Sequence, residues 1–139
     1  MVNHPQRKVG VISCSGEECI EGTISRIATR MVLEKLRPED TVTICLPLFL
    51  AGGKEERAFA KDYPTVTIDG CSKLCAKIAT ERHSGKIASS LVVSELTDDR
   101  KRSSRPRSTR KPREKDLALT ERVAEKIAQE VDKILNLGR

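Results

Sequence analysis

The sequence predicts an α/β fold of the Rossmann-like or flavodoxin-like type, in three layers, with about four parallel strands, helices on both faces and a long C-terminal helix. Two observations lead to this prediction. Short segments with the alternation of a strand are separated by segments whose apolar residues recur at helical spacing. Strands that alternate with helices form a parallel sheet, because each right-handed crossover places its helix over one face.

The first strand is expected in KVGVISC, residues 8–14, which ends at Cys14 and is followed by a turn at Ser15 and Gly16. A helix of about five turns is expected over 20–36, where apolar residues recur at helical spacing until Pro38 stops the pattern. The chain therefore begins with a strand, a turn and a helix.

Two further strands are expected where the same four letters occur twice, in TVTIC at 41–45 and in TVTID at 65–69, because both alternate Thr with an apolar residue. Between them we expect LPLFLAGG, 46–53, to form a loop and KEERAFAKDY, 54–63, to form a short helix. The repeated tetrapeptide thus marks two strands, each of which leads toward a cysteine.

A helix is expected to begin at Cys71, with an apolar face through Ile78, and to break at the segment 83–85. IASSLVVSEL, 87–96, is the expected fourth strand. The last element is a long amphipathic helix with an N-cap at Asp116 or Thr120. Its apolar stripe consists of Leu119, Val123, Ile127, Val131 and Ile134.

A chain of 139 residues is expected to form one domain, here 1–139. It contains no 18-residue apolar run and no charged-then-apolar leader. We therefore expect a cytoplasmic protein without a membrane segment. Its five cysteines are expected to stay reduced in that compartment, which favours metal binding or thiol chemistry over a disulfide framework.

The net charge of +6 comes from one segment. Residues 100–115 contain nine Lys or Arg and one Glu, which leaves 17 basic against 19 acidic groups in the rest of the chain. We expect a basic, mobile loop over about 98–115, because few apolar groups are present to offset its ordering entropy. The main interpretation is a solvated linker, and the alternative is a surface for nucleic acid or an acidic partner. The only aromatic residues are Phe49, Phe59 and Tyr63, so few side chains could stack on nucleic-acid bases.

Three cysteines follow three different predicted strands. Cys14, Cys45 and Cys71 are expected at the carboxyl edge of the sheet, where ligands bind in open α/β folds, and Cys75 lies one helical turn beyond Cys71. Four thiolates in a tetrahedral arrangement suit zinc. The spacing lacks the paired knuckles of zinc fingers, so buried small hydrophobic cysteines stay an alternative. Another alternative is a thiol redox or sulfur-transfer enzyme, with Cys14 as nucleophile and Cys19 as resolving thiol.

The segments CSG at 14–16, CLP at 45–47 and IDGCSKLCA at 68–76 resemble the DGC-domain family, over about residues 8–96. The resemblance implies a zinc ion bound by four cysteines and implies no particular biochemical role. Carried over to this chain, the ligands are Cys14, Cys45, Cys71 and Cys75. In the first loop this sequence departs from the family pattern, because SGEECIEGT adds Cys19, which is a further candidate as a fifth or exchanging ligand.

The residues next to these cysteines have more ordinary interpretations. Asp69 is expected to cap the following helix, and Gly70 to allow a close backbone approach. His83 is expected to be a solvent-facing residue at a helix end. No complete phosphate-binding motif is present, so binding of an anion at the loop glycines is weakly supported. These glycines are Gly16, Gly22, Gly52 and Gly53.

Overall fold

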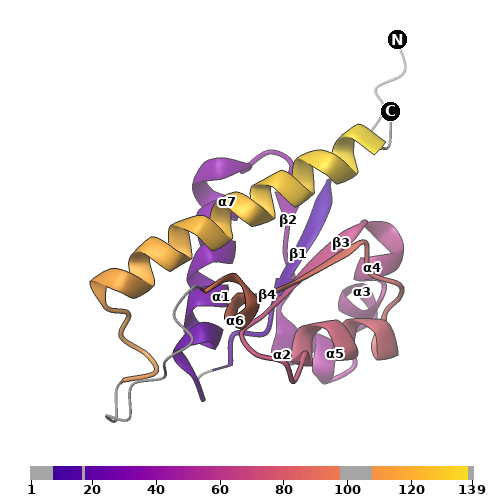
Figure 1. The fold of residues 1–139 in the computed structure, drawn as a ribbon. Coiled ribbons are helices and arrows are strands. Elements are labelled where there is room, and N and C mark those ends of the chain that lie inside the picture. Colours follow the sequence, from indigo (N-terminus) through magenta and orange to yellow (C-terminus); the bar gives the residue numbers. More distant parts are fainter. Residues whose placement is uncertain (1–7, 17, 98–107, 138–139) are drawn as a thin grey trace.

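The computed structural model describes residues 8–16, 18–97 and 108–137, and contains a four-stranded parallel sheet with the strand order β2-β1-β3-β4 (Figure 1). In chain order, the elements are β1 Val9–Ser13, α1 Ile20–Met31, the π-helical η1 Val32–Leu36, β2 Thr41–Val42, α2 Leu46–Leu50, α3 Lys54–Arg57, α4 Phe59–Asp62, β3 Thr65–Asp69, α5 Cys75–His83, β4 Ser89–Val92, α6 Val93–Leu96 and α7 Glu114–Leu137. The order matches the flavodoxin-like arrangement, in which the topological switch point lies between β1 and β3.

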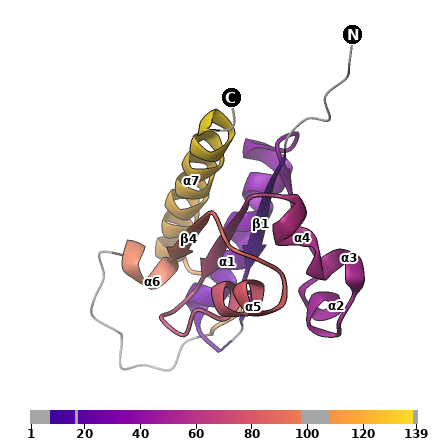
Figure 2. The ribbon, with the colours of Figure 1, turned by 90° about the vertical axis from the view of Figure 1, so that its right-hand side faces the viewer.

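One face of the sheet carries the larger apolar core. Alternate residues of the central strands, such as Val11 and Ile68, point to this face and are fully buried. Helix α1 contributes Ile24, and the long helix α7 contributes Val123 and Ile127 at helical spacing. Helices α1 and α7 therefore cover the same face of the sheet. Figure 2 shows α7 on the side of the sheet opposite α2–α4.

The other face has a smaller core and more polar groups. Ile12, Phe59 and Ala76 form its buried apolar cluster, under α4 and α5. The buried residues of β3 that alternate with Val66 and Ile68 are Thr65, Thr67 and Asp69. On this face Asp69 adds hydrogen bonds to the apolar contacts, because its carboxylate accepts from two backbone N–H groups of α5.

The predicted fold class is confirmed: four parallel strands lie between helices on both faces, and a long helix ends the described chain. The expectation of a loop over 46–53 is wrong in its first half, since Leu46–Leu50 forms α2. Pro47 is compatible with this helix because it lies in the first turn, where its missing N–H would have no partner. Residues 54–63 form two short helices rather than one.

Two predicted strands are shorter than expected. Strand β2 pairs with β1 only at Thr41 and Val42, so Cys45 lies beyond the strand end rather than on it. Strand β4 ends at Val92, and the expected continuation to residue 96 is the short helix α6. The run of buried apolar residues across this boundary explains the error, because strand and helix segments that are both buried look alike in sequence.

The C-terminal helix begins earlier than the sequence suggested. Its first residue is Glu114, and Asp116 is not the N-cap but lies in the first turn, where its carboxylate accepts a hydrogen bond from Arg113 N at 2.8 Å. Thr120 is buried inside the helix and donates to Asp116 O at 2.6 Å. The expected basic loop therefore ends before Glu114, and its part at 98–107 lies outside the described residues.

Two further features concern the helices. In the described parts of the chain, no helix is both long enough and apolar enough to cross a membrane. Helix α7 is joined to the end of η1 by a two-pronged ion pair, in which the Arg37 guanidinium donates to both carboxylate oxygens of Asp132 at 2.8 and 2.7 Å. Hydrogen bonding to Arg37 holds the pKa of Asp132 below its ordinary value of 3.8.

Replacing Asp132 by Asn should lower the free energy of unfolding by about 0.5–1 kcal/mol at neutral pH, since both side chains are partly exposed and water screens the pair. A lowered carboxyl pKa stabilises the fold above the ordinary value of 3.8, and this contribution disappears as pH falls through the lowered pKa. Denaturant titrations of wild type and Asp132→Asn should therefore converge in acid.

The control for this prediction is Glu125→Gln, at an exposed position of the same helix. It should change stability by less than the Asp132 substitution at every pH. A difference between wild type and Asp132→Asn that stays constant down to about pH 2 would contradict the assignment to the carboxylate charge.

Candidate metal and thiol site at the carboxyl edge of the sheet

All five cysteines are free, and all lie in loops or first turns at one edge of the sheet. Cys14 follows the last residue of β1, and Cys71 follows the end of β3 by two residues. Cys19, Cys45 and Cys75 lie at the starts of α1, α2 and α5. The expectation that strand ends bring the cysteines to the carboxyl edge therefore agrees with the structure, with Cys75 rather than Cys71 as the first residue of the helix.

The sulfur of Cys14 is held by neighbours from two other segments. Gly70 N donates a hydrogen bond to Cys14 Sγ at 3.3 Å, and the hydroxyl of Ser25 lies 3.6 Å from the same sulfur. The backbone of Cys14 continues the sheet, since its N–H donates to Ile68 O at 2.9 Å. These contacts fix the position of the Cys14 side chain at the end of β1, beside the loop that follows β3.

Cys75 interacts with two of the other thiols. Burial is the main cause that raises the pKa of its thiol above the ordinary value of 9.0, and the charges of Asp69, Cys14 and Cys71 add to this effect. Lys73 acts in the opposite direction. Cys14, Cys71 and Cys75 thus form one electrostatic group, drawn from the β1 end and from the segment between β3 and α5.

Cys19 belongs to the same region but interacts with a different neighbour. Burial raises the pKa of its thiol, a hydrogen bond from the Gly22 backbone lowers it, and the charges of Glu21 and Cys71 raise it again. No comparable effect of Cys14 on Cys19 is present. The expected pairing of Cys14 with Cys19 as nucleophile and resolving thiol stays a prediction.

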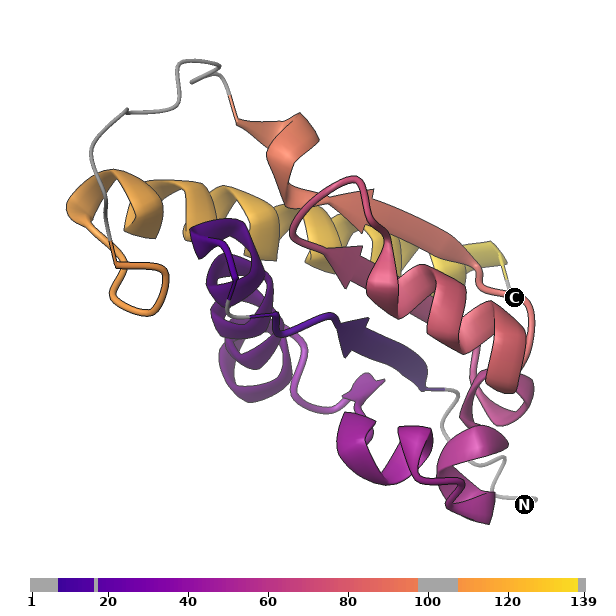
Figure 3. The same cartoon turned by 90° about the horizontal axis from the view of Figure 1, so that it is seen from below.

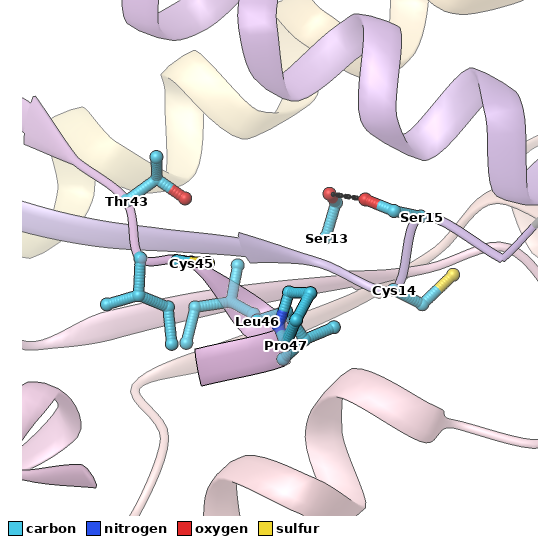
Figure 4. Close-up of a pocket in the computed structure, with 9 residues that line it drawn as sticks. Ser13, Cys14, Ser15, Thr43, Cys45, Leu46 and Pro47 are labelled. Carbon is cyan, nitrogen blue, oxygen red and sulfur yellow. Dashed lines mark hydrogen bonds between the residues drawn. The ribbon is translucent and has the colours of Figure 1, made fainter. Parts of the chain in front are cut away.

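Cys45 is exposed and lies across a pocket from Cys14 (Figure 4). The pocket has a volume of about 440 Å³ and no charged residue in its lining. On one side Ser13 and Ser15 share a hydrogen bond of 2.8 Å, and on the other lie the apolar side chains of the α2 start. In Figure 4 the sulfur of Cys14 points away from the segment that carries Cys45.

The thiols lie at one edge without being at ligand distance. Among residues 8–16, 18–97 and 108–137, no three His, Cys, Asp or Glu side chains are grouped closely enough to hold a metal ion. The charges of Cys14 and Cys71 act on the Cys75 thiol, and Cys45 lines a pocket together with Cys14. The donor set is chemically suited to zinc, but Cys14, Cys71 and Cys75 would have to come closer together, and Cys45 would have to move to join them.

The geometry of the site depends on the backbone contacts of Gly70. A Cβ at this position would lie 2.5 Å from Gly22 N and 2.7 Å from Glu21 C, so the end of β3 touches the backbone of the first turn of α1. The carbonyl of Gly70 accepts a hydrogen bond from Ser94 N at 3.1 Å. Gly22 is equally confined, because a Cβ there would lie 1.8 Å from Gly16 O. Sequence reasoning anticipated a close approach at Gly70 but not its partner.

Asp69 caps helix α5, as the sequence predicted. Its buried carboxylate accepts hydrogen bonds from Ala76 N at 2.6 Å and Lys77 N at 3.2 Å. Burial raises the pKa of this carboxyl group above 3.8, although both hydrogen bonds and the nearby Lys77 charge lower it. The cap fixes the first turn of α5, and therefore the position of Cys75, relative to the end of β3.

Backbone strain is concentrated next to two of the cysteines. Within the described residues, Ser15 (φ 53°) and Leu74 (φ 56°) are the non-glycine positions in the left-handed region. Ser15 follows Cys14, and Leu74 precedes Cys75. Such conformations cost about 1–3 kcal/mol each and persist at functional sites where the surroundings impose them. The strain therefore lies beside two of the three thiols in the electrostatic group, Cys14 and Cys75.

Ser25 is a site residue that sequence reasoning missed. Its fully buried hydroxyl donates to Gly22 O at 2.6 Å and lies beside Cys14 Sγ. The sequence carried one signal for it, a serine one turn after a helix-start glycine, beside the apolar stripe of α1. Ser25 is recognised as a site residue only because the structure places its hydroxyl beside Cys14 Sγ.

The remaining candidates lie away from the thiols or have structural roles. Gly52, in the left-handed region at φ 98°, and Gly53 belong to the turn between α2 and α3. His83 ends α5 and contacts the ring of Phe49 edge-on, with ring centroids 6.1 Å apart. His83 is exposed, as expected for a residue at a helix end.

The described end of the basic segment lies near the site. Thr23 in the first turn of α1 donates to Thr109 O at 2.5 Å, and Figure 3 shows the segment before α7 beside α1. The interaction with nucleic acid or an acidic partner stays a prediction, because residues 98–107 lie outside the described chain.

The substitution Gly70→Ala should lower the free energy of unfolding by at least about 1–3 kcal/mol, because the new methyl group would collide with backbone atoms that cannot rotate away. Denaturant unfolding of both proteins would measure the difference. Gly85→Ala is the matched control, since its Cβ would lie 3.4 Å from the flexible Lys61 Cγ and 3.7 Å or more from atoms of Ala60, which are ordinary van der Waals contacts. Equal stability of the two variants would contradict the proposed contact.

Removing the cap with Asp69→Ala should destabilise the protein by about 1–3 kcal/mol, since the buried Ala76 N–H and the partly buried Lys77 N–H lose their acceptors. Asp69→Asn keeps one acceptor and should recover part of this loss. Protection of the Ala76 and Lys77 amides from hydrogen exchange should fall in the same order, from wild type through Asp69→Asn to Asp69→Ala. Unchanged protection of both amides in Asp69→Ala would show that the cap is unimportant.

The comparison with known families agrees with this description. A family model described as DGC domain matches residues 10–134, which includes the sheet, the cysteine loops and most of α7. No curated protein and no solved structure gave a match. The motif Asp69-Gly70-Cys71 coincides with the helix cap, the backbone contact and one of the coupled thiols. The chain belongs to the DGC domain family.

Proposed function

We propose that the protein binds a zinc ion through the thiolates of Cys14, Cys71 and Cys75, with Cys45 as the fourth ligand. The observation that carries this proposal is the placement of three thiols at one edge of the sheet: Cys14 directly follows β1, Cys71 follows β3 by two residues, and Cys75 begins α5. A divalent cation stabilises thiolates that gather around it, because attraction to the ion replaces the repulsion among them. Bound zinc would hold the ends of β1, β3 and α5 together at one point.

The choice of the fourth ligand follows from the pocket. Cys14 and Cys45 line the same cavity, so movement of the exposed loop before α2 would bring Cys45 toward the other thiols. Cys19 is the competing fourth ligand, because it already interacts with Cys71. If zinc is bound with Cys45 as the fourth ligand, Cys19 stays a free thiol beside the ion.

Protein purified without oxygen should contain about one zinc per chain, with about four sulfur neighbours near ~2.3 Å in the X-ray absorption spectrum. The variants Cys14→Ser, Cys71→Ser and Cys75→Ser should each lose most of the metal. Cys45→Ser should weaken binding more than Cys19→Ser. Ser72→Ala, an exposed neighbour of Cys71, is the matched control and should keep full occupancy.

Less than about half an equivalent of any metal in a normally folded protein would overturn the proposal. Full occupancy in Cys45→Ser together with loss in Cys19→Ser would transfer the fourth position to Cys19. These two results are distinct, because the first concerns the metal and the second concerns only its ligand set.

A thiol enzyme is the second candidate, favoured by the hydrogen bond from Gly70 N to Cys14 Sγ and by the pocket beside that sulfur. In this case Cys14 would be the nucleophile of a redox or sulfur-transfer reaction. Alkylation in the presence of a chelator separates the two functions. Fast, selective modification of Cys14 would favour thiol chemistry, whereas uniformly slow modification of all five cysteines would count against it.

A further inference from the structure

The loop before α1 and the loop after β3 are held against each other by their backbones. Gly22 N donates to Cys19 O at 3.1 Å, and a Cβ on Gly70 would lie 2.5 Å from the same nitrogen. The chain passes directly from Gly70 into Cys71. The turn that carries Cys19 therefore lies beside the segment that carries Cys71.

A second contact joins the same two loops farther out. Lys73 Nζ lies 3.6 Å from Glu18 Oε2, and both side chains are largely exposed. An exposed pair of this kind contributes little energy, but it shows that Glu18, next to Cys19, and Lys73, two residues after Cys71, face each other.

From this geometry we infer that Cys19 and Cys71 form a reversible disulfide when the protein meets a peroxide. Both cysteines are half-buried, so a small oxidant reaches them. The inference rests on the proposed zinc site only for its consequence, since the disulfide itself needs no metal. Cys19, which is not among the proposed zinc ligands, is thereby assigned as the disulfide partner of Cys71, which is one of them.

Hydrogen peroxide supplies the two oxidising equivalents. The Cys71 thiolate attacks one peroxide oxygen, the O–O bond breaks, and a sulfenic acid and hydroxide form. The Cys19 thiolate then attacks the sulfenic sulfur, so that the S–S bond forms and the S–O bond breaks with loss of a second hydroxide. The two thiol protons convert both hydroxides to water. Two thiols are thus oxidised by two electrons, and one peroxide is reduced to two waters.

The disulfide has a direct consequence for the proposed metal site. A disulfide sulfur is no longer a thiolate ligand, so Cys71 would leave the zinc ion and the remaining ligands would hold it less tightly. A small thiol reductant reverses the bond by exchange and restores the ligand. Cys19 would thereby couple metal retention to the redox state of the compartment.

The full chain, reduced and then either zinc-loaded or metal-free, would be treated with one equivalent of hydrogen peroxide and digested without reduction. Trypsin followed by cleavage after glutamate places Cys14, Cys19, Cys71 and Cys75 in separate peptides, because Glu17 and Glu18 lie between the first two and Lys73 between the last two. Mass spectrometry should then identify the Cys19–Cys71 peptide as the main cross-link. Zinc release would be followed in parallel with a chromogenic chelator.

In Cys19→Ser, peroxide should release zinc about tenfold more slowly than in wild type, because the sulfenic acid has no resolving thiol beside it. Ser72→Ala should behave like wild type. A dominant cross-link between Cys14 and Cys75 or between Cys71 and Cys75, in metal-free protein, would overturn the inference. If wild type binds no metal but forms the Cys19–Cys71 cross-link, the proposed function fails while this inference stands.

Discussion

The contact between the backbones of Gly70 and Gly22 is the constraint on which the rest of the site depends. It brings the end of β3 against the first turn of α1, at a distance that a side chain on Gly70 would prevent, and a side chain on Gly22 would collide with the backbone of Gly16. Because Gly70 also donates to Cys14 Sγ and accepts from Ser94 N, one residue connects β1, β3, α1 and α6. The two glycines therefore keep the thiol of the first strand beside the loop of the third.

Neighbouring residues of the DGC motif have different structural roles. Asp69 fixes the start of α5 through two hydrogen bonds, Gly70 makes the backbone contact, and Cys71 begins the loop that leads to Cys75. The strained backbone at Leu74 directs the chain from this loop into the helix. Cap, contact and strain together position thiols that come from segments about 60 residues apart in the chain.

The sequence allowed much of this arrangement to be predicted, because strand alternation and helical spacing are local patterns. It placed Cys14 and Cys71 at the carboxyl edge and identified Asp69 as a cap. It failed where local patterns are ambiguous: the apolar segment 46–53 looked like a loop but contains α2, and the buried residues after Val92 looked like strand. The position of Cys45 depends on these details, since β2 ends three residues earlier.

The sequence by itself determined the order of strands and helices, the edge at which the cysteines gather and the family to which the motif points. Only the tertiary structure decided which thiols act on one another electrostatically: the charges of Cys14 and Cys71 act on Cys75, the charge of Cys71 acts on Cys19, and Cys45 lies across a pocket from Cys14. The physical reason is that hydrophobic periodicity is set by nearest neighbours along the chain. The approach of two loops is set by sheet order and by how closely two glycine backbones can pack.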